Sequence, residues 1–311
     1  MQLLEFDFRG GLDRDKLREA AHALGAFRVR HPLFPAARCR ETLTVVRAFF
    51  DLPAAEKQRL AIERSPHFRG YSVMHNERDW REQIHLGREE EARLGSLYEQ
   101  LRGPNLWPSD FAWKSAMLEL IAALERTARD VLSALAISLG LPRERFVTEE
   151  ELAYLVIKLI HYQPLAESEA RTGVAPHVDF SWITLLLQDD TGGLEIRDAD
   201  GKWFVVPPIP GTLVVNVGEI MEFATRGYYP AAPHRVINGA RSRISLPFFL
   251  NPDLDTRVEP VDLAAGADPV DDGTHVHRVF STARQDPFVY GDEEWKRKGL
   301  NVYCGTCVAS P

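Results

Sequence analysis

The sequence predicts a β-rich α+β protein in which a helical N-terminal region precedes a core of the sandwich or jelly-roll kind. Three observations support this class. A long apolar stripe with helical period lies within the first 150 residues. From about residue 154 to residue 250 the chain instead divides into short β-rich segments separated by Gly, Pro, Asp and Asn. No helical pattern is evident between these segments, which favours antiparallel sheets over a parallel α/β sheet.

The clearest element of the N-terminal region is a helix expected from about Asp110 to Leu139. Gly140 and Pro142 follow it and provide a stop signal. Its apolar residues recur three, four or seven positions apart and therefore share one face, namely Met117, Ile121, Leu124, Val131, Leu135 and Leu139.

Seven segments of the second half are expected to be strands, because each is rich in β-formers and is bounded by turn residues. They are YLVIKLIHY, WITLLLQ, GLEIRD, WFVVPP, GTLVVNV, HRVIN and RISLPFFL. Beyond residue 250 we expect loops and a short helix near DEEWKRK. The chain accordingly divides into an N-terminal helical region (1–150), a β-rich core (151–252) and a C-terminal extension (253–311).

Length, composition and charge narrow the functional classes. The 311 residues are enough for one large domain, and 45% hydrophobic with 26% charged residues is ordinary for a globular protein. A net charge of -8 without a Lys/Arg block argues against a nucleic-acid partner. The sequence shows no signal peptide and no apolar stretch of roughly 20 residues, so we expect no membrane span.

Cysteine content indicates the compartment. Three cysteines are too few for a disulfide framework, so we expect a protein of the reducing cytoplasm, with no protein partner evident. Cys304 and Cys307 form a lone CxxC without the second pair that a zinc site needs. His275 and His277 lie two apart with no third ligand evident, so a surface loop is the simpler interpretation.

Two side chains that can bind a metal occur on one predicted strand, in APHVDFSW. His177 and Asp179 are two positions apart, so on a strand they would point to the same face. A second histidine, His234, follows in AAPHRVIN. Singly these are weak signals, because a solvated strand edge or a structural histidine is the commoner case. Together, two imidazoles and one carboxylate are the facial triad of non-haem Fe(II), which leaves three coordination positions open.

A candidate carboxylate receptor follows in RSRISLPF, where Arg243 and Ser245 would share a strand face. The planar guanidinium of an arginine binds a carboxylate through two parallel hydrogen bonds, and a neighbouring hydroxyl can add another. A metal triad and an inward carboxylate receptor together are what a 2-oxo acid co-substrate requires. One end of such an acid chelates iron, while the other end is held some distance away.

From Tyr162 to Asn251 the chain resembles the isopenicillin-N-synthase-like branch of the Fe(II)/2-oxoglutarate-dependent dioxygenases. The family's motifs occur in order as HVD, a GGLEI hairpin, a DGKW turn, a VPPIPG turn, a VVNVG strand, APHRV and RIS. Upstream, FRGYSVMHNERDWREQIHLG is similar to a segment of the family's N-terminal half. The resemblance covers most of the chain. It implies a double-stranded β-helix, which is a distorted jelly roll, supported by an N-terminal helical region.

The resemblance also implies roles for individual residues. Ile160 stands where the family's NYYPP motif has its asparagine, which puts in doubt a contact to the iron-bound end of 2-oxoglutarate. Arg226 and Ala231 also depart from the family's usual asparagine and serine without touching a predicted ligand. The iron ligands are matched by His177, Asp179 and His234, and the residues that bind the distal carboxylate of 2-oxoglutarate by Arg243, Ser245 and Tyr162.

The implied activity is oxidation of a C–H bond of a small molecule with Fe(II), 2-oxoglutarate and O2, in specialised metabolism. Hydroxylation is the expected outcome, and desaturation or ring closure are the alternatives. Three rival functions remain. An iron oxidase that needs no oxoglutarate is disfavoured by the carboxylate receptor, and a halogenase is disfavoured by Asp179. A non-catalytic sensor of the same fold would bind small molecules without turning over oxoglutarate.

For substrate binding the sequence offers three candidates, Arg69 and Tyr71 in FRGYS and Phe249 beyond the RIS segment. We predict that Arg69 lies at the mouth of the iron pocket and binds a carboxylate of the substrate. The alternative is a structural arginine that bonds backbone carbonyls in a turn. For Phe249 the alternatives are the pocket wall and the hydrophobic core.

Overall fold

The computed structural model describes residues 2–93, 95–165, 171–263, 278 and 286–302. Four residues discussed above lie outside these ranges: His275, His277, Cys304 and Cys307. Within the described ranges, no helix is both long and apolar enough to span a membrane.

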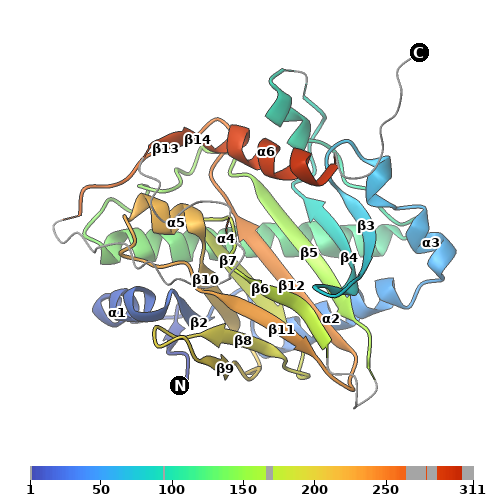
Figure 1. The fold of residues 1–311 in the computed structure, drawn as a ribbon, viewed down its shortest axis with the longest axis horizontal. Helices are drawn as coiled ribbons and strands as arrows, with labels where there is room; N and C mark the ends of the chain where they lie inside the picture. Colours follow the sequence, from blue (N-terminus) through green and yellow to red (C-terminus); the bar gives the residue numbers. More distant parts are fainter. Residues whose placement is uncertain (1, 94, 166–170, 264–277, 279–285, 303–311) are drawn as a thin grey trace.

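Two sheets form the centre of the molecule (Figure 1). The larger has eight strands in the order β1-β2-β10-β7-β12-β5-β4-β3, and its strands pair antiparallel except for β1 with β2. These strands are β1 (Glu5–Asp7), β2 (Ala26–Arg30), β3 (Gly70–His75), β4 (Trp80–Gly87), β5 (Leu155–Tyr162), β7 (Ile183–Gln188), β10 (Leu213–Val217) and β12 (Arg243–Leu250).

The smaller sheet has four antiparallel strands in the order β6-β11-β8-β9. Its strands are β6 (Arg171–His177), β8 (Leu194–Arg197), β9 (Trp203–Val205) and β11 (His234–Asn238). All seven predicted strand segments are therefore present, and their antiparallel arrangement is confirmed.

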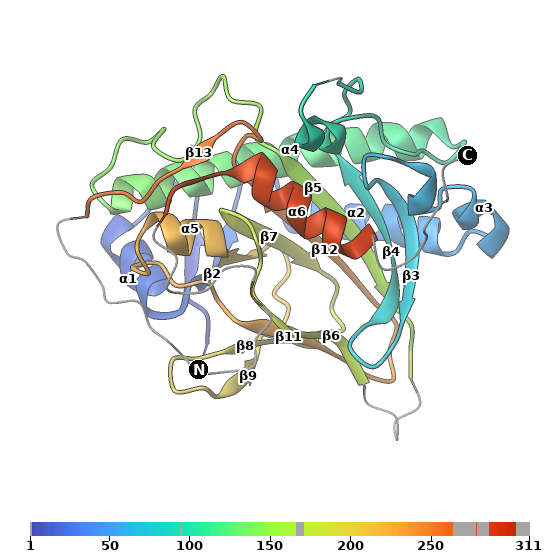
Figure 2. The same cartoon turned by 45° about the horizontal axis from the view of Figure 1, so that its top comes forward.

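Helices cover the outer face of the larger sheet (Figures 1 and 2). The longest begins where the Asp110 carboxylate accepts hydrogen bonds from the N–H groups of Ala112 and Trp113. Its predicted apolar stripe is buried except for Leu139, which follows the helix and is partly buried. Strands such as β10 are consequently buried on both faces, by helices on one side and by the smaller sheet on the other. These helices are α1 (Arg14–Leu24), α2 (Ala36–Phe50) and α4 (Phe111–Ser138).

The first 150 residues are less helical than predicted, because β1 to β4 all belong to the larger sheet. The remaining elements of this half are short: α3 (Ala54–Gln58), η1 (Ile62–Arg64) and η2 (Leu97–Leu101). Strand β4 was missed because half of its sequence, WREQIHLG, is polar although nearly all of it is buried. Buried polar residues hide the hydrophobic alternation by which a strand is recognised.

The expectation of no helix within the β-rich half was wrong, since α5 (Glu219–Ala224) lies between β10 and β11. Six residues make fewer than two turns, too few to produce a periodic pattern. The helix predicted near DEEWKRK is confirmed as α6 (Tyr290–Val302), which lies across β5 and β12 in both cartoon views. A small ribbon of β13 (Arg257–Val258) and β14 (Phe288–Val289) precedes it.

Candidate iron centre and co-substrate pocket

A cavity of about 790 Å³ lies between the two sheets. Its walls are formed by β4, β5, β7, β10 and β12 of the larger sheet and by β6, β8 and β11 of the smaller one. Residues 76–79 of the turn between β3 and β4 and residues of α6 complete them. Cavities of this volume are typical of small-molecule sites. Seven residues predicted from the sequence line it: His177, Asp179, His234, Arg243, Ser245, Tyr162 and Phe249.

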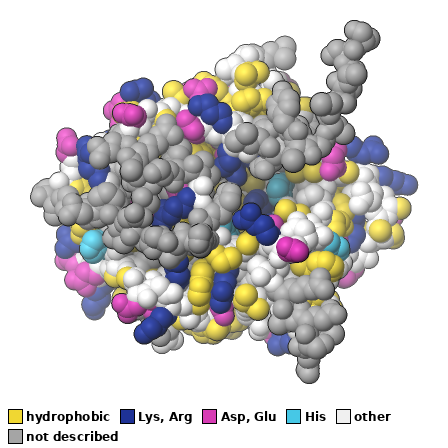
Figure 3. Space-filling model, viewed as in Figure 1, with side chains coloured by type: hydrophobic (Ala, Val, Ile, Leu, Met, Phe, Trp, Pro, Cys, Tyr) yellow, Lys and Arg dark blue, Asp and Glu magenta, His cyan; other side chains and the backbone are white. Residues whose placement is uncertain are grey.

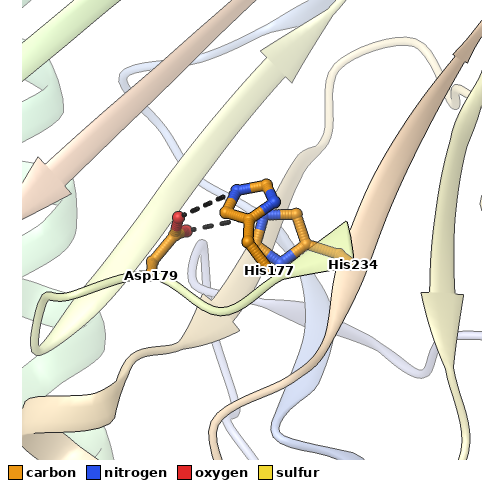
Figure 4. A group of neighbouring side chains, drawn as sticks. All are labelled: His177, Asp179 and His234. Carbon is orange, nitrogen blue, oxygen red and sulfur yellow. Dashed lines mark ion pairs between the residues drawn. The ribbon is translucent and has the colours of Figure 1, made fainter. Parts of the chain in front are cut away.

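Neighbouring strands of the smaller sheet bring the two histidines together. His177 is the last residue of β6 and His234 is the first residue of β11, and they are direct partners in the ladder. Asp179 lies beyond the end of β6, so the prediction that one strand carries both His177 and Asp179 was wrong. The chain bends there, and the Asp179 carbonyl accepts a hydrogen bond from the Glu219 N–H. The three side chains converge nonetheless (Figure 4).

Backbone carbonyls set the orientation of both imidazole rings. The Nδ1 atom of His177 lies 2.9 Å from the Ala175 carbonyl oxygen, and that of His234 lies 3.0 Å from the Ala232 carbonyl oxygen. A carbonyl can only accept, so each Nδ1 carries the proton and each Nε2 keeps a free lone pair. The Nε2 atoms of His177 and His234 lie 3.5 and 3.7 Å from the Asp179 carboxylate.

The Asp179 carboxylate is held in place by two neighbours on the larger sheet. Thr184 Oγ1 of β7 donates to Asp179 Oδ2 at 2.6 Å, and Asn216 Nδ2 of β10 donates to the same oxygen at 2.8 Å. Both donors are buried. Sequence analysis missed them, although a lone asparagine among the valines of VVNV was a usable signal. Such outer partners orient a metal ligand and fix its protonation state.

The protonation states also suit a metal. Burial by itself would raise the pKa of the Asp179 carboxyl, but His234, His177 and the Thr184 hydroxyl hold it well below its usual range. Burial lowers the pKa of His234, and His177 lowers it further, so this imidazole is neutral near pH 7. Neutral imidazoles and an ionised carboxylate are the forms that bind metals. The ligand atoms lie within 4.8 Å of one another, so these residues fit a single ion such as Fe(II).

Arg243 occupies another part of the cavity wall, on β12. It is 2% exposed, and its guanidinium carbon lies 4.8 Å from the centre of the Tyr162 ring, directly opposite in the ladder. Its Nη2 donates to Gln188 at 3.2 Å, whereas Nε and Nη1 have no hydrogen-bond partner among the described residues. Leaving buried N–H groups unpaired is costly. A carboxylate bound there would pair with them.

The structure does not bring every predicted residue to the cavity. Arg69 is 1% exposed, lies 5.5 Å from the centre of the Tyr154 ring and donates to the Leu101 carbonyl oxygen at 3.3 Å. Its predicted position at the pocket mouth is therefore wrong, and the carbonyl-bonding alternative holds. The Tyr71 hydroxyl donates to the buried Glu82 carboxylate at 2.5 Å. Neither Arg69 nor Tyr71 lines the cavity.

Other cavity residues were not anticipated. Lys158 alternates with Ile160 and Tyr162 along β5, so its place on the same face could have been read from the periodicity of two. The residues Tyr290, Glu294, Arg297 and Lys298 come from α6, more than a hundred positions further along the chain. No local sequence pattern indicates that this helix closes one end of the cavity.

Comparison with known proteins agrees with the fold and the site. The family model of the 2OG-Fe(II) oxygenase superfamily matches residues 153–252, and that of the non-haem dioxygenase N-terminal region, named for morphine synthesis, matches residues 14–110. A 2-oxoglutarate-Fe(II) type oxidoreductase of Aspergillus fumigatus is 36% identical over 260 residues, which are 76% of this chain and 76% of that protein.

A homoarginine-6-hydroxylase of Glycine max is 31% identical over 293 residues, which are 89% of this chain and 85% of that protein. Among solved structures, the rice dioxygenase for auxin oxidation is 27% identical, covers 96% of both chains and superposes with a TM-score of 0.72.

The chain therefore belongs to the 2OG-Fe(II) oxygenase superfamily. Within it, the chain is a 2-oxoglutarate-dependent non-haem iron dioxygenase of the isopenicillin-N-synthase-like group. Its cofactor is Fe(II) and its co-substrates are 2-oxoglutarate and O2. The predicted jelly-roll fold and reaction class are both confirmed.

Proposed function

We propose that this enzyme oxidises a C–H bond of a small organic molecule in specialised metabolism, with hydroxylation as the main outcome. One observation carries the assignment of roles within the site. The convergent triad and a buried, partly unpaired arginine line the same cavity. We assign the iron to the triad, and the distal carboxylate of 2-oxoglutarate to Arg243 with Ser245 and Tyr162.

The triad residues hold the metal in a fixed geometry. His177 and His234 would each offer Nε2, because their Nδ1 protons are committed to carbonyl oxygens. Asp179 would offer Oδ1, because Thr184 and Asn216 both bond to Oδ2. When bound, Fe(II) supplies the oxidising chemistry with O2 and 2-oxoglutarate, which leaves as succinate and CO2.

Arg243 positions the co-substrate. The guanidinium would bind the distal carboxylate through Nε and Nη1, and Gln188 holds the third nitrogen in place. Tyr162 packs against the guanidinium and limits its rotation. Apolar residues between the two ends of the cavity exclude bulk water, which strengthens these polar contacts, and they include Ile160, Leu186, Leu194, Ile196, Val214 and Val236.

The named relatives support a small organic substrate. The homoarginine hydroxylase and the dioxygenase for auxin oxidation are both named for small molecules. The cavity volume agrees with this, since about 790 Å³ holds a co-substrate together with a molecule of modest size.

The decisive experiment measures succinate formation from 2-oxoglutarate with Fe(II) and O2. We expect turnover in the unmodified enzyme and none in His177→Ala, Asp179→Ala or His234→Ala. Asp200→Ala removes an exposed carboxylate in the β8–β9 turn and serves as the control with normal turnover. A titration with Mn(II) should show weakened metal binding in the three triad variants only.

Two results would contradict this assignment. Unaltered oxoglutarate turnover in a triad variant would remove that residue from the iron site. Metal and oxoglutarate binding without any succinate in the unmodified enzyme would favour a sensor, whereas oxidation of an organic substrate without succinate would favour an oxoglutarate-independent oxidase.

A further inference from the structure

Lys158 stands on the cavity-facing side of β5, away from the Arg243 pocket. Val156, Lys158, Ile160 and Tyr162 alternate along this strand, and all four line the cavity. Tyr162 is level with Arg243 in the ladder, and Lys158 lies four residues away. Four residues of strand span roughly 13 Å. The two cations therefore serve different parts of the cavity.

Within the described ranges, no carboxylate forms an ion pair with Lys158. Among the described residues it has neither a hydrogen bond nor an ion pair, and its Nζ lies 5.0 Å from the centre of the Phe249 ring. Two other basic residues of the cavity wall are paired. Arg81, which the strand register places at the Tyr162 end, bonds to Asp79 at 3.0 Å, and Arg297 of α6 bonds to Glu294 at 2.6 Å.

This end of the cavity carries an excess of positive charge. Lys298 shares Glu294 with Arg297, at 3.8 Å, so one carboxylate serves two cations. Lys158 adds a further positive charge with no counter-ion among the described residues. Lys and Arg side chains lie near the middle of the face shown in Figure 3, beside hydrophobic ones.

The surroundings of Lys158 oppose its charge. Burial, together with the positive charges of Arg81 and Arg297, lowers the pKa of the Lys158 ammonium to about 8. Burial likewise lowers the pKa of Lys298 to about 7. A lysine that is desolvated and placed among other cations is stabilised by any anion that enters. Phe249, Phe180 and Tyr290 offer aromatic surface beside it.

We propose that Lys158 binds a carboxylate of the organic substrate, whose apolar or aromatic body packs against Phe249. This inference rests on the proposed function, because it divides one cavity between two acids. 2-Oxoglutarate takes the Arg243 end, and the substrate acid takes the Lys158 end. Lys158 on β5 thus takes the role that the sequence had suggested for Arg69, which is to bind the carboxylate of the substrate. Such a contact fixes which C–H bond of the substrate faces the metal.

The test compares acids with their neutral amides. The enzyme is loaded with Mn(II) and 2-oxoglutarate, and calorimetry then measures the binding of phenylacetate, 3-phenylpropanoate and 4-phenylbutanoate, each against its amide. We expect at least one acid to bind tenfold or more tightly than its amide. In Lys158→Met this preference should disappear, and in Lys158→Arg part of it should return. Lys202→Met, in the exposed β8–β9 turn, is the control that should keep it.

Three outcomes would overturn the inference. The acids could bind no better than their amides, or the preference could survive in Lys158→Met. The third outcome is that Lys158→Met weakens 2-oxoglutarate as much as the probes, which would make Lys158 a co-substrate residue. Failure of the proposed function is separate, because it appears as absent succinate in the unmodified enzyme whatever the acids do.

Discussion

The two faces of the larger sheet, on either side of β5, carry buried charge in opposite ways. On the outer face of β5, His161 bonds to Glu82, which also receives Lys57 Nζ at 2.7 Å and the Tyr71 hydroxyl at 2.5 Å. On the inner face, the guanidinium beside Tyr162 has two nitrogens without a partner among the described residues. The charges of the Glu82 cluster are paired within the protein, whereas Nε and Nη1 of Arg243 are left for the bound carboxylate that we propose.

The difference shows how to separate structural from ligand-binding charges. A buried ion whose partners all belong to the protein is part of the folded structure. Removing one partner leaves the other charge buried and unpaired, which destabilises the fold. A buried ion left short of partners costs stability and is retained for another reason. By this criterion we expect Glu82 to be structural, and Arg243 and Lys158 to bind ligands as proposed above. Substitutions at each can test the distinction.

The largest effect on stability is expected at Glu82. Glu82→Ala leaves Lys57 buried without its counter-ion, so the free energy of unfolding should fall by about 3–5 kcal/mol. Denaturant unfolding measures this change, and Glu41→Ala, an exposed helix position, is the control expected within about 0.5 kcal/mol of the unmodified protein. Normal stability in Glu82→Ala would contradict a structural role.

The same carboxylate predicts a loss of stability in acid. Burial by itself raises the pKa of Glu82, but the bonds from His161, Lys57 and Tyr71 outweigh it and lower the pKa from 4.5 to about 2. A depressed folded-state pKa contributes stability above the unfolded value, and this contribution is lost as pH falls from 4.5 to about 2. Glu82→Gln should remove that part of the pH dependence.

A smaller free-energy change, confined to binding, is expected at Arg243. A charge-assisted hydrogen-bond pair contributes about 1.5–3 kcal/mol, so Arg243→Met should raise the Kd for 2-oxoglutarate roughly tenfold to a hundredfold. Because the guanidinium is unpaired in the free protein, the melting temperature should stay the same or rise. A large drop in melting temperature with unchanged oxoglutarate affinity would reverse the comparison with Glu82.

The next largest effect is the pH dependence of carboxylate binding at Lys158. Lys158 binds a carboxylate only as the protonated ammonium. The affinity for 3-phenylpropanoate should therefore fall as the pH rises through the Lys158 pKa of about 8. Between pH 7 and pH 9 the fall should be roughly tenfold, and the amide should show none. A flat profile for the acid would exclude Lys158 as its receptor. The charges of Arg81, Arg297, Glu294 and Asp179 act on the pKa of Lys158. Lys158 in turn lowers the pKa of Lys298.

The smallest effects are expected beside Arg243. Tyr162→Phe and Ser245→Ala each remove one neutral hydroxyl, which contributes about 0.5–1.5 kcal/mol where it bonds to a ligand. The Kd for 2-oxoglutarate should therefore rise by no more than about tenfold in either variant. An effect as large as that of Arg243→Met would mean that the hydroxyls, and not the guanidinium, carry most of the binding.

The sequence by itself determined the strand segments and the longest helix, and it predicted the ligand types and the carboxylate receptor that we propose. These depend on residue identity and on short-range periodicity, which survive in a linear chain: His177, His234 and Arg243 are recognisable from their neighbours in sequence. The same local information placed Asp179 on a strand and missed α5, because a bend and a helix of six residues leave no periodic trace.

Only the tertiary structure decided which charges have partners. Glu82 of β4 meets Lys57 of α3 and His161 of β5, and Tyr71 bonds to the same carboxylate instead of lining the cavity. Arg69 turns inward towards carbonyl oxygens, while Lys158 is left facing the cavity. Whether a buried charge is paired depends on residues brought together by long-range packing, and one-dimensional patterns carry no information about those neighbours.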